Sequence, residues 1–160
     1  MAENAQSAEN QPVFSIEKIY VRDLSLEVPN GSESFLIRNA TPQVNVKLNT
    51  EAAPIEKNIY EVKLTVTVET VLPDKRTLFL IELTQAGIFR IQNVPESELE
   101  LVLGIGCPNI LFPYARETIS DGVTRAGFQP VLLAPVNFEV LFNQSRQQQT
   151  QVGAQGAPLQ

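Results

Sequence analysis

The chain has 160 residues, 43% of them hydrophobic, which fits one folded globular domain large enough to bury a core. Its formal net charge of −6 argues against a generic grip on the phosphate backbone of nucleic acid. The chain has no histidine and one cysteine, which excludes Ser-His-Asp and Cys-His nucleophile pairs, histidine-containing zinc sites and an internal disulfide.

The two ends of the chain are polar and lack the apolar periodicity of a packed element. Residues 1–11 contain neither a basic residue nor an apolar run, so we expect no signal peptide there. We interpret residues 1–11 and the Gln-rich residues 144–160 as disordered tails, which leaves residues 12–143 as the folded region. No apolar run approaches the about 18 residues of a membrane span. One cysteine is compatible with a reducing compartment, so we expect a cytoplasmic protein.

Period-two alternation predicts four strands after the N-terminal tail. Along residues 59–72, the even positions from Tyr60 to Val68 are apolar and the odd positions from Glu61 to Glu69 are polar. The other three predicted strands are residues 13–28, 42–50 and 77–91. In the first of them the phase slips around Ile19–Tyr20, which indicates a bulge. Short turns connect the four segments, so we expect an antiparallel sheet, since parallel pairs need long crossovers.

The predicted strand at residues 77–91 is apolar on both faces. Leu78 and Leu80 share one face with Glu82, and the other face carries Phe79, Ile81, Leu83 and Gln85. An antiparallel sheet with one wet face should alternate more cleanly. Either the protein's own helices cover one face, or that face meets another subunit in an obligate oligomer.

The period changes to that of a helix after residue 95. A first helix is predicted to begin after Pro95, and we interpret residues 104–106, with the sequence GIG, as a loop. A second helix is predicted over residues 110–127, with Pro113 in its first turn and Gly127 just beyond its end.

A short last helix is predicted over residues 137–144, with Asn137 as its N-cap. Strands followed by helices indicate an α+β fold.

The sequence carries no motif that points to catalysis. It has no G-x-x-x-x-G-K-[ST] loop, so we expect no nucleotide-driven step and no cofactor. We interpret Glu96, Glu98 and Glu100 as the solvated start of a helix rather than as a metal site. Cys107 has no cysteine or histidine partner and lies among aliphatic residues, so we interpret it as a buried small side chain rather than as a nucleophile or a metal ligand.

Five segments together point to a known family. IYVRDLSLEVP, YEVKLTVTV, FLIELTQAGIF, CPNILFPYARE and APVNF, in this order and at these separations, strongly resemble the SecB protein-export chaperones. The resemblance covers roughly residues 13 to 143 and implies a cytosolic, ATP-independent holdase. Such a protein binds unfolded secretory precursors and delivers them to the SecA motor of the translocon. It also implies a homotetramer, a dimer of dimers, in which each subunit has a four-stranded antiparallel sheet with C-terminal helices.

Position by position, the resemblance implies three sets of functional residues. The surface that binds SecA would comprise Asp23, Glu27, Leu80 and Glu82. The groove that binds unfolded clients would include Val44, Val46, Leu48, Tyr60, Phe79 and Phe138. The tetramer would be held together by the other face of the fourth strand, at Ile81, Leu83 and Gln85.

Two alternatives stay open. The same fold could serve a toxin–antitoxin system instead of export, in which case no binding to SecA is expected. A small-molecule carrier or enzyme with a β-lined pocket is the other alternative, although the sequence shows no paired carboxylates or lysines for catalysis.

Overall fold

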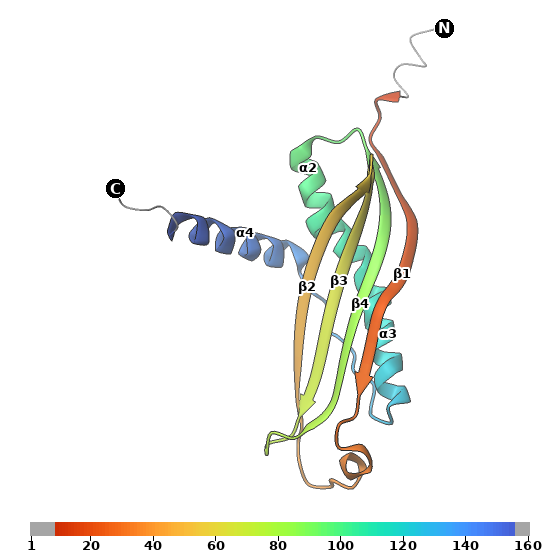
Figure 1. Ribbon diagram of the computed structural model, residues 1–160, viewed down its shortest axis with the longest axis vertical. Coiled ribbons are helices and arrows are strands. Elements are labelled where there is room, and N and C mark those ends of the chain that lie inside the picture. Colours follow the sequence, from red (N-terminus) through yellow and green to blue (C-terminus); the bar gives the residue numbers. More distant parts are fainter. Residues whose placement is uncertain (1–8, 156–160) are drawn as a thin grey trace.

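The computed structural model describes residues 9–155 and shows a four-stranded antiparallel sheet with helices packed on one face (Figure 1). The strands lie in the order β1-β4-β3-β2, with the bounds β1 Val13–Glu27, β2 Gln43–Glu56, β3 Ile59–Val71 and β4 Thr77–Gln92. The helical elements are η1 Gly31–Phe35, α2 Glu96–Leu101, the π-helical turn η2 Val102–Gly106, α3 Cys107–Arg125 and α4 Phe138–Gln155. The predicted α+β class and the antiparallel sheet are confirmed.

The connections between strands leave β1 and β2 as the two edges of the sheet. Asn58, at a φ of 64°, lies in the turn between β2 and β3, and Lys75, at a φ of 75°, lies in the turn between β3 and β4. The N–H of Leu72 donates to the carbonyl of Arg76 at 2.8 Å and closes the second hairpin. The segment from β1 to β2 contains η1 and crosses the end of the sheet, so β1 pairs only with β4 and β2 only with β3.

β1 shifts its register against β4 twice, between Ile16 and Lys18 and between Val21 and Asp23. The two shifts flank the Ile19–Tyr20 pair, where the sequence predicted a bulge. A bulge places one extra residue on one strand, so the apolar side chains of β1 return to the helix side of the sheet after each shift. We call this helix side the inner face and the opposite side the outer face.

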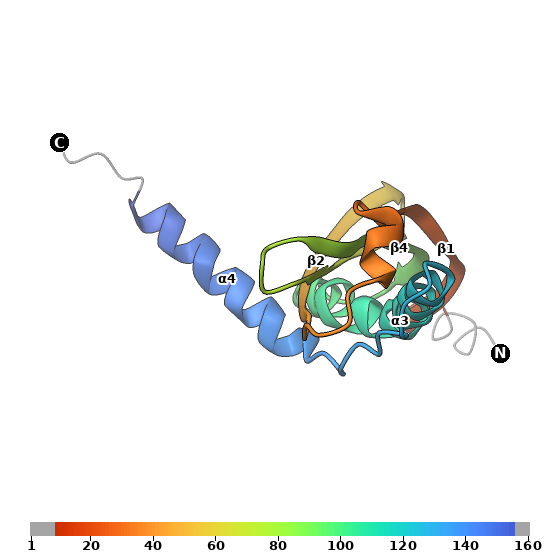
Figure 2. The same cartoon turned by 90° about the horizontal axis from the view of Figure 1, so that it is seen from below.

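Residues 96–125 form one continuous helical rod along the inner face, which corrects the predicted pair of separate helices (Figures 1 and 2). The predicted loop at residues 104–106 is part of a π-helical turn, in which the N–H of Cys107 donates to the carbonyl of Val102. Pro113, predicted in the first turn of a helix, lies inside α3, and Pro108 lies at the start of α3. A proline has no N–H for the helix ladder, and its ring presses on the preceding turn. The wider π turn in front of Pro108 gives that ring room.

The core lies between the inner face and α3, so the protein's own helices cover one face of β4. Leu111, Ala115, Ile119 and Val123 recur at helical spacing on α3 and are fully buried. They pack with the fully buried sheet residues Val62, Leu64, Val66, Val68, Ile81, Leu83 and Phe89. Cys107 lies in the same core, where burial raises the pKa of its thiol to about 12. The interpretation of Cys107 as a packed small side chain is therefore confirmed.

The predicted end of α3 and the predicted start of α4 are both confirmed. Gly127 has a φ of 95°, and its N–H donates to the carbonyl of Thr124 at 3.0 Å. The N–H of Phe128 donates to the carbonyl of Val123 at 3.2 Å, which completes a Schellman motif. At the start of α4, Asn137 Oδ1 accepts a hydrogen bond from the N–H of Val140 at 3.2 Å.

α4 continues to Gln155 and projects from the body of the molecule (Figures 1 and 2). The sequence had predicted a disordered tail at residues 144–160. Glutamine is a good helix former, and extending an existing helix costs far less than starting one, so the missing apolar period does not stop the helix. Arg146 also pairs with Glu100 of α2 at 2.7 Å. Residues 1–8 and 156–160 of the two predicted tails lie outside the described residues.

Candidate functional site

An apolar groove opens on the inner side of edge strand β2, beside α3. Val44 and Val46 are 47% and 45% exposed, although their register partners on β3, Thr70 and Val68, are buried. The segment that connects α3 to α4 forms the facing wall, and its two prolines keep it out of a regular helix. The groove has a volume of about 560 Å³ and is lined entirely by apolar residues: Val44, Val46, Leu48, Phe112 and residues 130–136.

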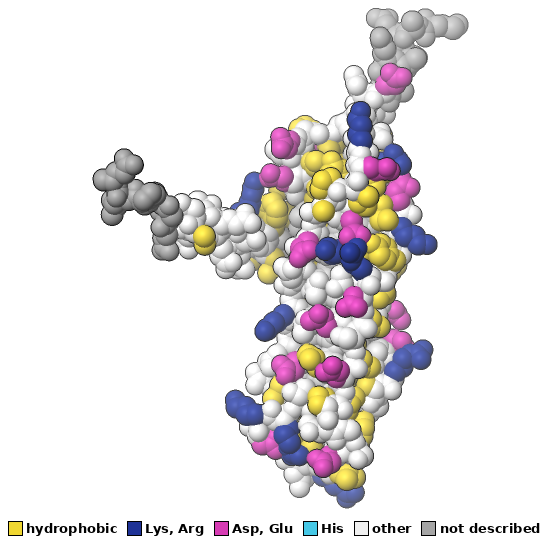
Figure 3. Space-filling view, in the orientation of Figure 1, with side chains coloured by type: hydrophobic (Ala, Val, Ile, Leu, Met, Phe, Trp, Pro, Cys, Tyr) yellow, Lys and Arg dark blue, Asp and Glu magenta, His cyan; other side chains and the backbone are white. Residues whose placement is uncertain are grey.

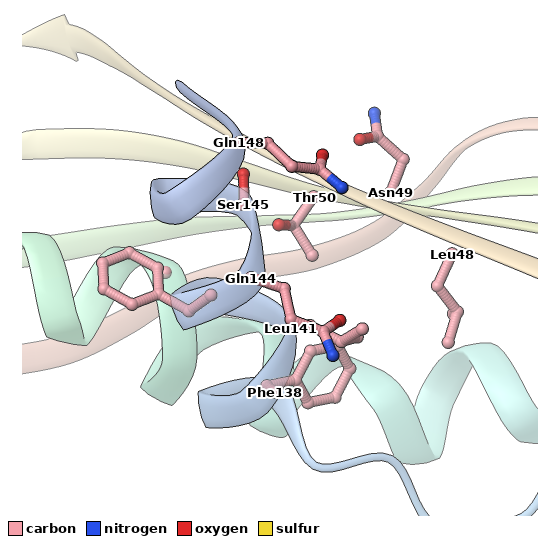
Figure 4. A pocket seen from close by; sticks show the side chains of 10 residues that line it. Leu48, Asn49, Thr50, Phe138, Leu141, Gln144, Ser145 and Gln148 are labelled. Atoms are coloured by element: carbon pink, nitrogen blue, oxygen red, sulfur yellow. The ribbon is translucent and has the colours of Figure 1, made fainter. Parts of the chain in front are cut away.

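A second cavity of about 240 Å³ lies between β2 and α4 (Figure 4). Leu48 lines both cavities, so the second one adjoins the apolar groove. Phe138, Leu141 and Phe142 of α4 supply apolar lining. The polar lining consists of Asn49, Thr50, Gln144, Ser145 and Gln148, which carry no charge. An extended chain leaving the groove along β2 would therefore pass from apolar side chains to amides and hydroxyls.

Four of the six predicted client-binding residues lie at these two cavities. Val44, Val46 and Leu48 line the groove, and Leu48 and Phe138 line the adjoining cavity. Phe138 is only 2% exposed and meets the ring of Phe112 edge-on, with the ring centroids 5.9 Å apart. Phe138 is thus part of the floor of the site rather than a freely accessible contact.

The structure places the other two predicted client-binding residues elsewhere. Phe79 is 3% exposed and packs against Phe128 at a centroid distance of 4.9 Å, and Phe128 stacks on Phe35 at 5.0 Å. Tyr60 is half-buried on the inner face, in register with Phe89 of β4. Neither residue lines the groove, so the predicted set divides into one connected group and two separate residues.

Sequence reasoning missed the second wall of the groove. Phe112 and residues 130–136 line it, and Leu132 is 78% exposed. The available signal was an apolar run between Pro130 and Pro135 that matches neither the helical nor the strand period. Such a run has no partner within its own element, so it is a candidate for a surface that binds apolar side chains.

The four residues predicted to bind SecA all lie on the outer face. Glu27 pairs in register with Leu80, Ser25 with Glu82, and Asp23 with Thr84, and paired residues point to the same face of a sheet. Glu82 also accepts a hydrogen bond from the hydroxyl of Thr67 at 3.2 Å. Within residues 9–155 the helices lie on the other face of the sheet (Figure 1), and acidic side chains are spread over the lower half of the outer face (Figure 3).

Ion pairs neutralise the carboxylates near the other end of the outer face. Arg22 donates from Nη1 to both carboxylate oxygens of Glu61 at 3.0 Å, and the hydroxyl of Tyr20 donates to the same group. The hydrogen bond to Glu61 raises the pKa of Tyr20. Lys63 pairs with Glu51 at 2.9 Å.

The three residues predicted to hold the tetramer together lie inside the core, which corrects that prediction. Ile81 and Leu83 have no exposed surface and Gln85 is 2% exposed, so they offer nothing for another subunit to contact. Ile81 packs on α3 where Gly122 leaves room, since a Cβ at Gly122 would lie 2.7 Å from the Ile81 side chain. Gln85 donates to the carbonyl of Tyr20 at 3.1 Å and ties β1 to β4. These residues can affect assembly only through the placement of α3 and β1.

A stripe of exposed apolar side chains follows the inner side of edge strand β1, and sequence reasoning did not single it out. Its members are between 38% and 47% exposed: Phe14, Ile16, Val21, Leu24 and Leu26. They pair in register with buried inner-face residues of β4, but α3 does not cover them. The alternation within residues 13–28 was the available signal, yet it gave no indication that the strand would lie at an edge.

Within the described residues 9–155, no group of three or more Cys, Asp or Glu side chains is placed to hold a metal ion. In the same part of the chain, no helix is long and apolar enough to cross a membrane.

Comparisons with known proteins agree on one family. A family model described as preprotein translocase subunit SecB matches residues 7–149. The protein-export protein SecB of Aromatoleum aromaticum is 65% identical over 142 residues, which cover 89% of this chain and 87% of the relative. The protein of the same name from Neisseria gonorrhoeae is 54% identical over 151 residues, covering 94% of this chain and 99% of the relative.

Among solved structures, a similar fold occurs in the SecB-like chaperone of Mycobacterium tuberculosis in complex with a ChAD peptide from the HigA1 antitoxin. The TM-score is 0.62 with 14% sequence identity, and the match covers 85% of this chain and 97% of that chain. At this identity the similarity shows a shared fold alone.

Proposed function

The chain belongs to the SecB family of preprotein translocase subunits, and we propose that it is an ATP-independent holdase that keeps secretory precursors unfolded and delivers them to SecA. SecB is a family of chaperones rather than of enzymes, and the chain serves protein export as its relatives do. The observation that carries the finer proposal is the apolar groove between β2 and residues 130–136. Its lining contains no charge that would select one sequence.

The groove supplies a mechanism for holding unfolded chains. Burying apolar surface is worth about 25 cal/mol per Å², or about 1.5–3 kcal/mol for a whole Val, Leu or Phe side chain, before the cost of ordering the client. Affinity then grows with the length of exposed apolar chain rather than with a particular sequence. A protein that folds quickly buries these side chains before capture, whereas a slowly folding precursor leaves them available.

A charged residue in the groove tests this mechanism. We expect Val46→Asp to weaken binding of an unfolded precursor about tenfold or more, because it removes an apolar contact and places a carboxylate in an apolar wall. Val152→Asp is the matched control, since Val152 is 75% exposed on α4 and lines neither cavity. The measurement is suppression of aggregation of a denatured precursor together with a binding titration. Equal activity of both variants would refute the groove as the client site.

We propose that SecA docks on the outer face at Asp23, Glu27, Leu80 and Glu82. Support comes from their common face, their register and, within residues 9–155, the position of the helices on the opposite face (Figure 1). Neutralising Glu82 with Glu82→Gln should weaken binding of SecA while leaving suppression of client aggregation unchanged, because the two surfaces lie on opposite faces. A variant that loses both activities together would contradict separate sites.

We also propose that the chain assembles as a homotetramer, a dimer of dimers. The support is the apolar stripe on the inner side of β1, since an edge strand with an uncovered apolar flank is a site where subunits associate. Native mass spectrometry should give a tetramer, and Leu24→Glu should shift the population toward smaller species. A wild-type monomer would refute the assembly.

The remaining parts of the proposal follow from the same assignment. Residues 12–143 are the chaperone domain, flanked by the segments 1–11 and 144–160, and the protein acts in the cytoplasm. Service in a toxin–antitoxin system is the alternative, and its support is limited to the shared fold of the mycobacterial chaperone. A pull-down from the cytoplasmic fraction separates the two, because capture of SecA supports export and its absence supports the alternative.

A further inference from the structure

Glu69 of β3 stands beside the residues proposed to bind SecA. Its register partner on β4 is Leu80, and the register partner of Leu80 on β1 is Glu27. Neighbouring strands lie about 4.8 Å apart, so a carboxylate flanks Leu80 on each side along the same row of the sheet. The hydroxyl of Thr77 donates to the carboxylate of Glu69 at 3.0 Å, which limits the rotamers of this side chain.

The carboxylates of the outer face fall into two groups. One group has basic partners at 2.7–3.0 Å and consists of Glu17, Glu51 and Glu61. The other group makes no ion pair within residues 9–155 and consists of Glu56, at the far end of β2, and of Asp23, Glu27, Glu69 and Glu82. Within the second group, Glu27 and Glu69 flank Leu80 in register, and Glu82 lies two residues from Leu80 along β4.

Basic residues near the second group are few. Lys47 of β2 lies two strands from Glu82, in register with Thr67 of β3. In the turn that follows β3, Arg76 pairs with Asp74 at 2.9 Å, and Lys75 is exposed. On the rows of the sheet that hold Asp23, Glu27, Glu69 and Glu82, these four carboxylates outnumber the single lysine, Lys47. The excess of negative charge favours a basic partner.

We propose that Glu69 is a further docking residue for SecA, and that Glu69 and Glu27 recognise a SecA segment with a basic residue on each side of an apolar one. The apolar side chain would contact Leu80, and each basic side chain would meet one carboxylate. This inference rests on the proposed docking surface and extends it from β1 and β4 onto β3. The surface would then select segments by the position of their charges as well as by apolar contact. An uncharged apolar segment would leave the carboxylates of Glu27 and Glu69 without a partner.

The expected loss of SecA binding follows from the solvent exposure of the ion pair that Glu69 would form with a basic residue of SecA. Glu69 is half-buried, and a solvent-accessible ion pair contributes modestly, so neutralising it should weaken SecA binding about two- to fivefold. The loss should shrink as salt is raised, since the Debye length falls from about 10 Å at 0.1 M to about 3 Å at 1 M.

The test compares three variants of the full chain in a titration with purified SecA at low and high salt. Glu69→Gln removes the charge in question, and Glu82→Gln reports on the docking surface itself. Glu51→Gln is the matched control, because it removes the same charge from the same face at a carboxylate paired with Lys63. Suppression of client aggregation serves as the readout of folding for all three.

Weaker binding by Glu69→Gln and Glu82→Gln, with Glu51→Gln near wild type, supports the inference. If Glu82→Gln weakens binding but Glu69→Gln matches Glu51→Gln, Glu69 is not a docking residue and the docking surface stands. Equal losses for Glu69→Gln and Glu51→Gln indicate a general charge effect and also overturn the inference. If neither Glu82→Gln nor Glu69→Gln weakens binding, the proposed docking surface itself is refuted.

Discussion

Gly104 is the position at which α4 rests on the helical rod. A Cβ added there would lie 2.5 Å from two atoms of the Phe142 ring, well inside van der Waals contact. Gly104→Ala should therefore push Phe142, and α4 with it, away from the rod. Gly106 lies in the same π-helical turn but would meet nothing within 4 Å, so Gly106→Ala is the matched control.

Two opposing effects set the expected magnitudes. Alanine is favoured over glycine by about 1 kcal/mol in a helix interior, so both variants should stabilise the rod by a similar amount. Overpacking costs about 1–3 kcal/mol, and only Gly104→Ala incurs it. Because α4 projects from the body, this cost should appear as local release of α4 rather than as global unfolding. Local release by that amount speeds exchange of the α4 amides about 5- to 150-fold.

Hydrogen exchange read by mass spectrometry measures this directly. We expect faster exchange in peptides from residues 138–155 of Gly104→Ala and unchanged exchange in those of Gly106→Ala, with β3 and β4 protected in both. If α4 of Gly104→Ala exchanges as slowly as in wild type, the contact of Phe142 with the rod does not hold α4 in place. Equal release of α4 in both variants would point to the π turn itself instead of the clash.

Three further predictions concern stability. Burial raises the pKa of Cys107 from 9.0 to about 12, so the folded state favours the protonated thiol. As pH rises from 9.0 to about 12, the unfolded chain loses this proton before the folded protein does, so the free energy of unfolding should fall. Urea unfolding across this range should show the decline in wild type and a shallower one in Cys107→Ala. Leu111→Ala should lower the free energy of unfolding by about 2–5 kcal/mol, because it leaves a cavity in the core. Leu132→Ala should change it by less than about 0.5 kcal/mol, because Leu132 is exposed. Similar urea midpoints for the two variants would contradict the burial of Leu111 and the exposure of Leu132. Asn137→Ala should destabilise α4 by about 1 kcal/mol through loss of the bond to Val140, and Asn143→Ala, within α4, should not, as judged by amide exchange in the first turn.

Local chemistry was sufficient to predict that the four strands exist and to predict two helix ends, but not the end of β2, which runs to Glu56 rather than to residue 50. Alternation along residues 59–72 places every second side chain on one face whatever the fold, so β3 was predictable. Gly127 and Asn137 act on backbone groups within a few residues of themselves, so their capping roles were predictable as well.

The same local rules gave wrong predictions where distant residues decide the outcome. Pro108, Pro113 and the two glycines of the 104–106 segment favour a break in the helix, yet packing against the sheet and against Phe142 keeps the rod continuous. The prediction of a disordered tail at residues 144–160 rested on the lack of a regular spacing of apolar residues there. The helix propensity of these residues and the Arg146–Glu100 ion pair nevertheless extend α4 to Gln155.

Some residues of the candidate SecA-binding surface could be predicted from local spacing, and others depend on contacts between distant parts of the chain. Asp23, Glu27, Leu80 and Glu82 could be placed on one face from spacing and resemblance, because the two-residue period of a strand is intrinsic to the backbone. The presence of Glu69 beside Leu80 depends on how β3 pairs with β4, which no spacing within one strand reveals.

Local patterns in the sequence were enough to predict four strands, their faces, the two helix caps and the family. The folded arrangement was needed to learn which strands lie at the edges and which face of β4 the rod covers. It was also needed to place Ile81, Leu83 and Gln85 in the core rather than at an interface. The reason is physical. Periodicity and capping act between residues close in the chain, whereas strand order and burial are set by contacts between residues far apart in it.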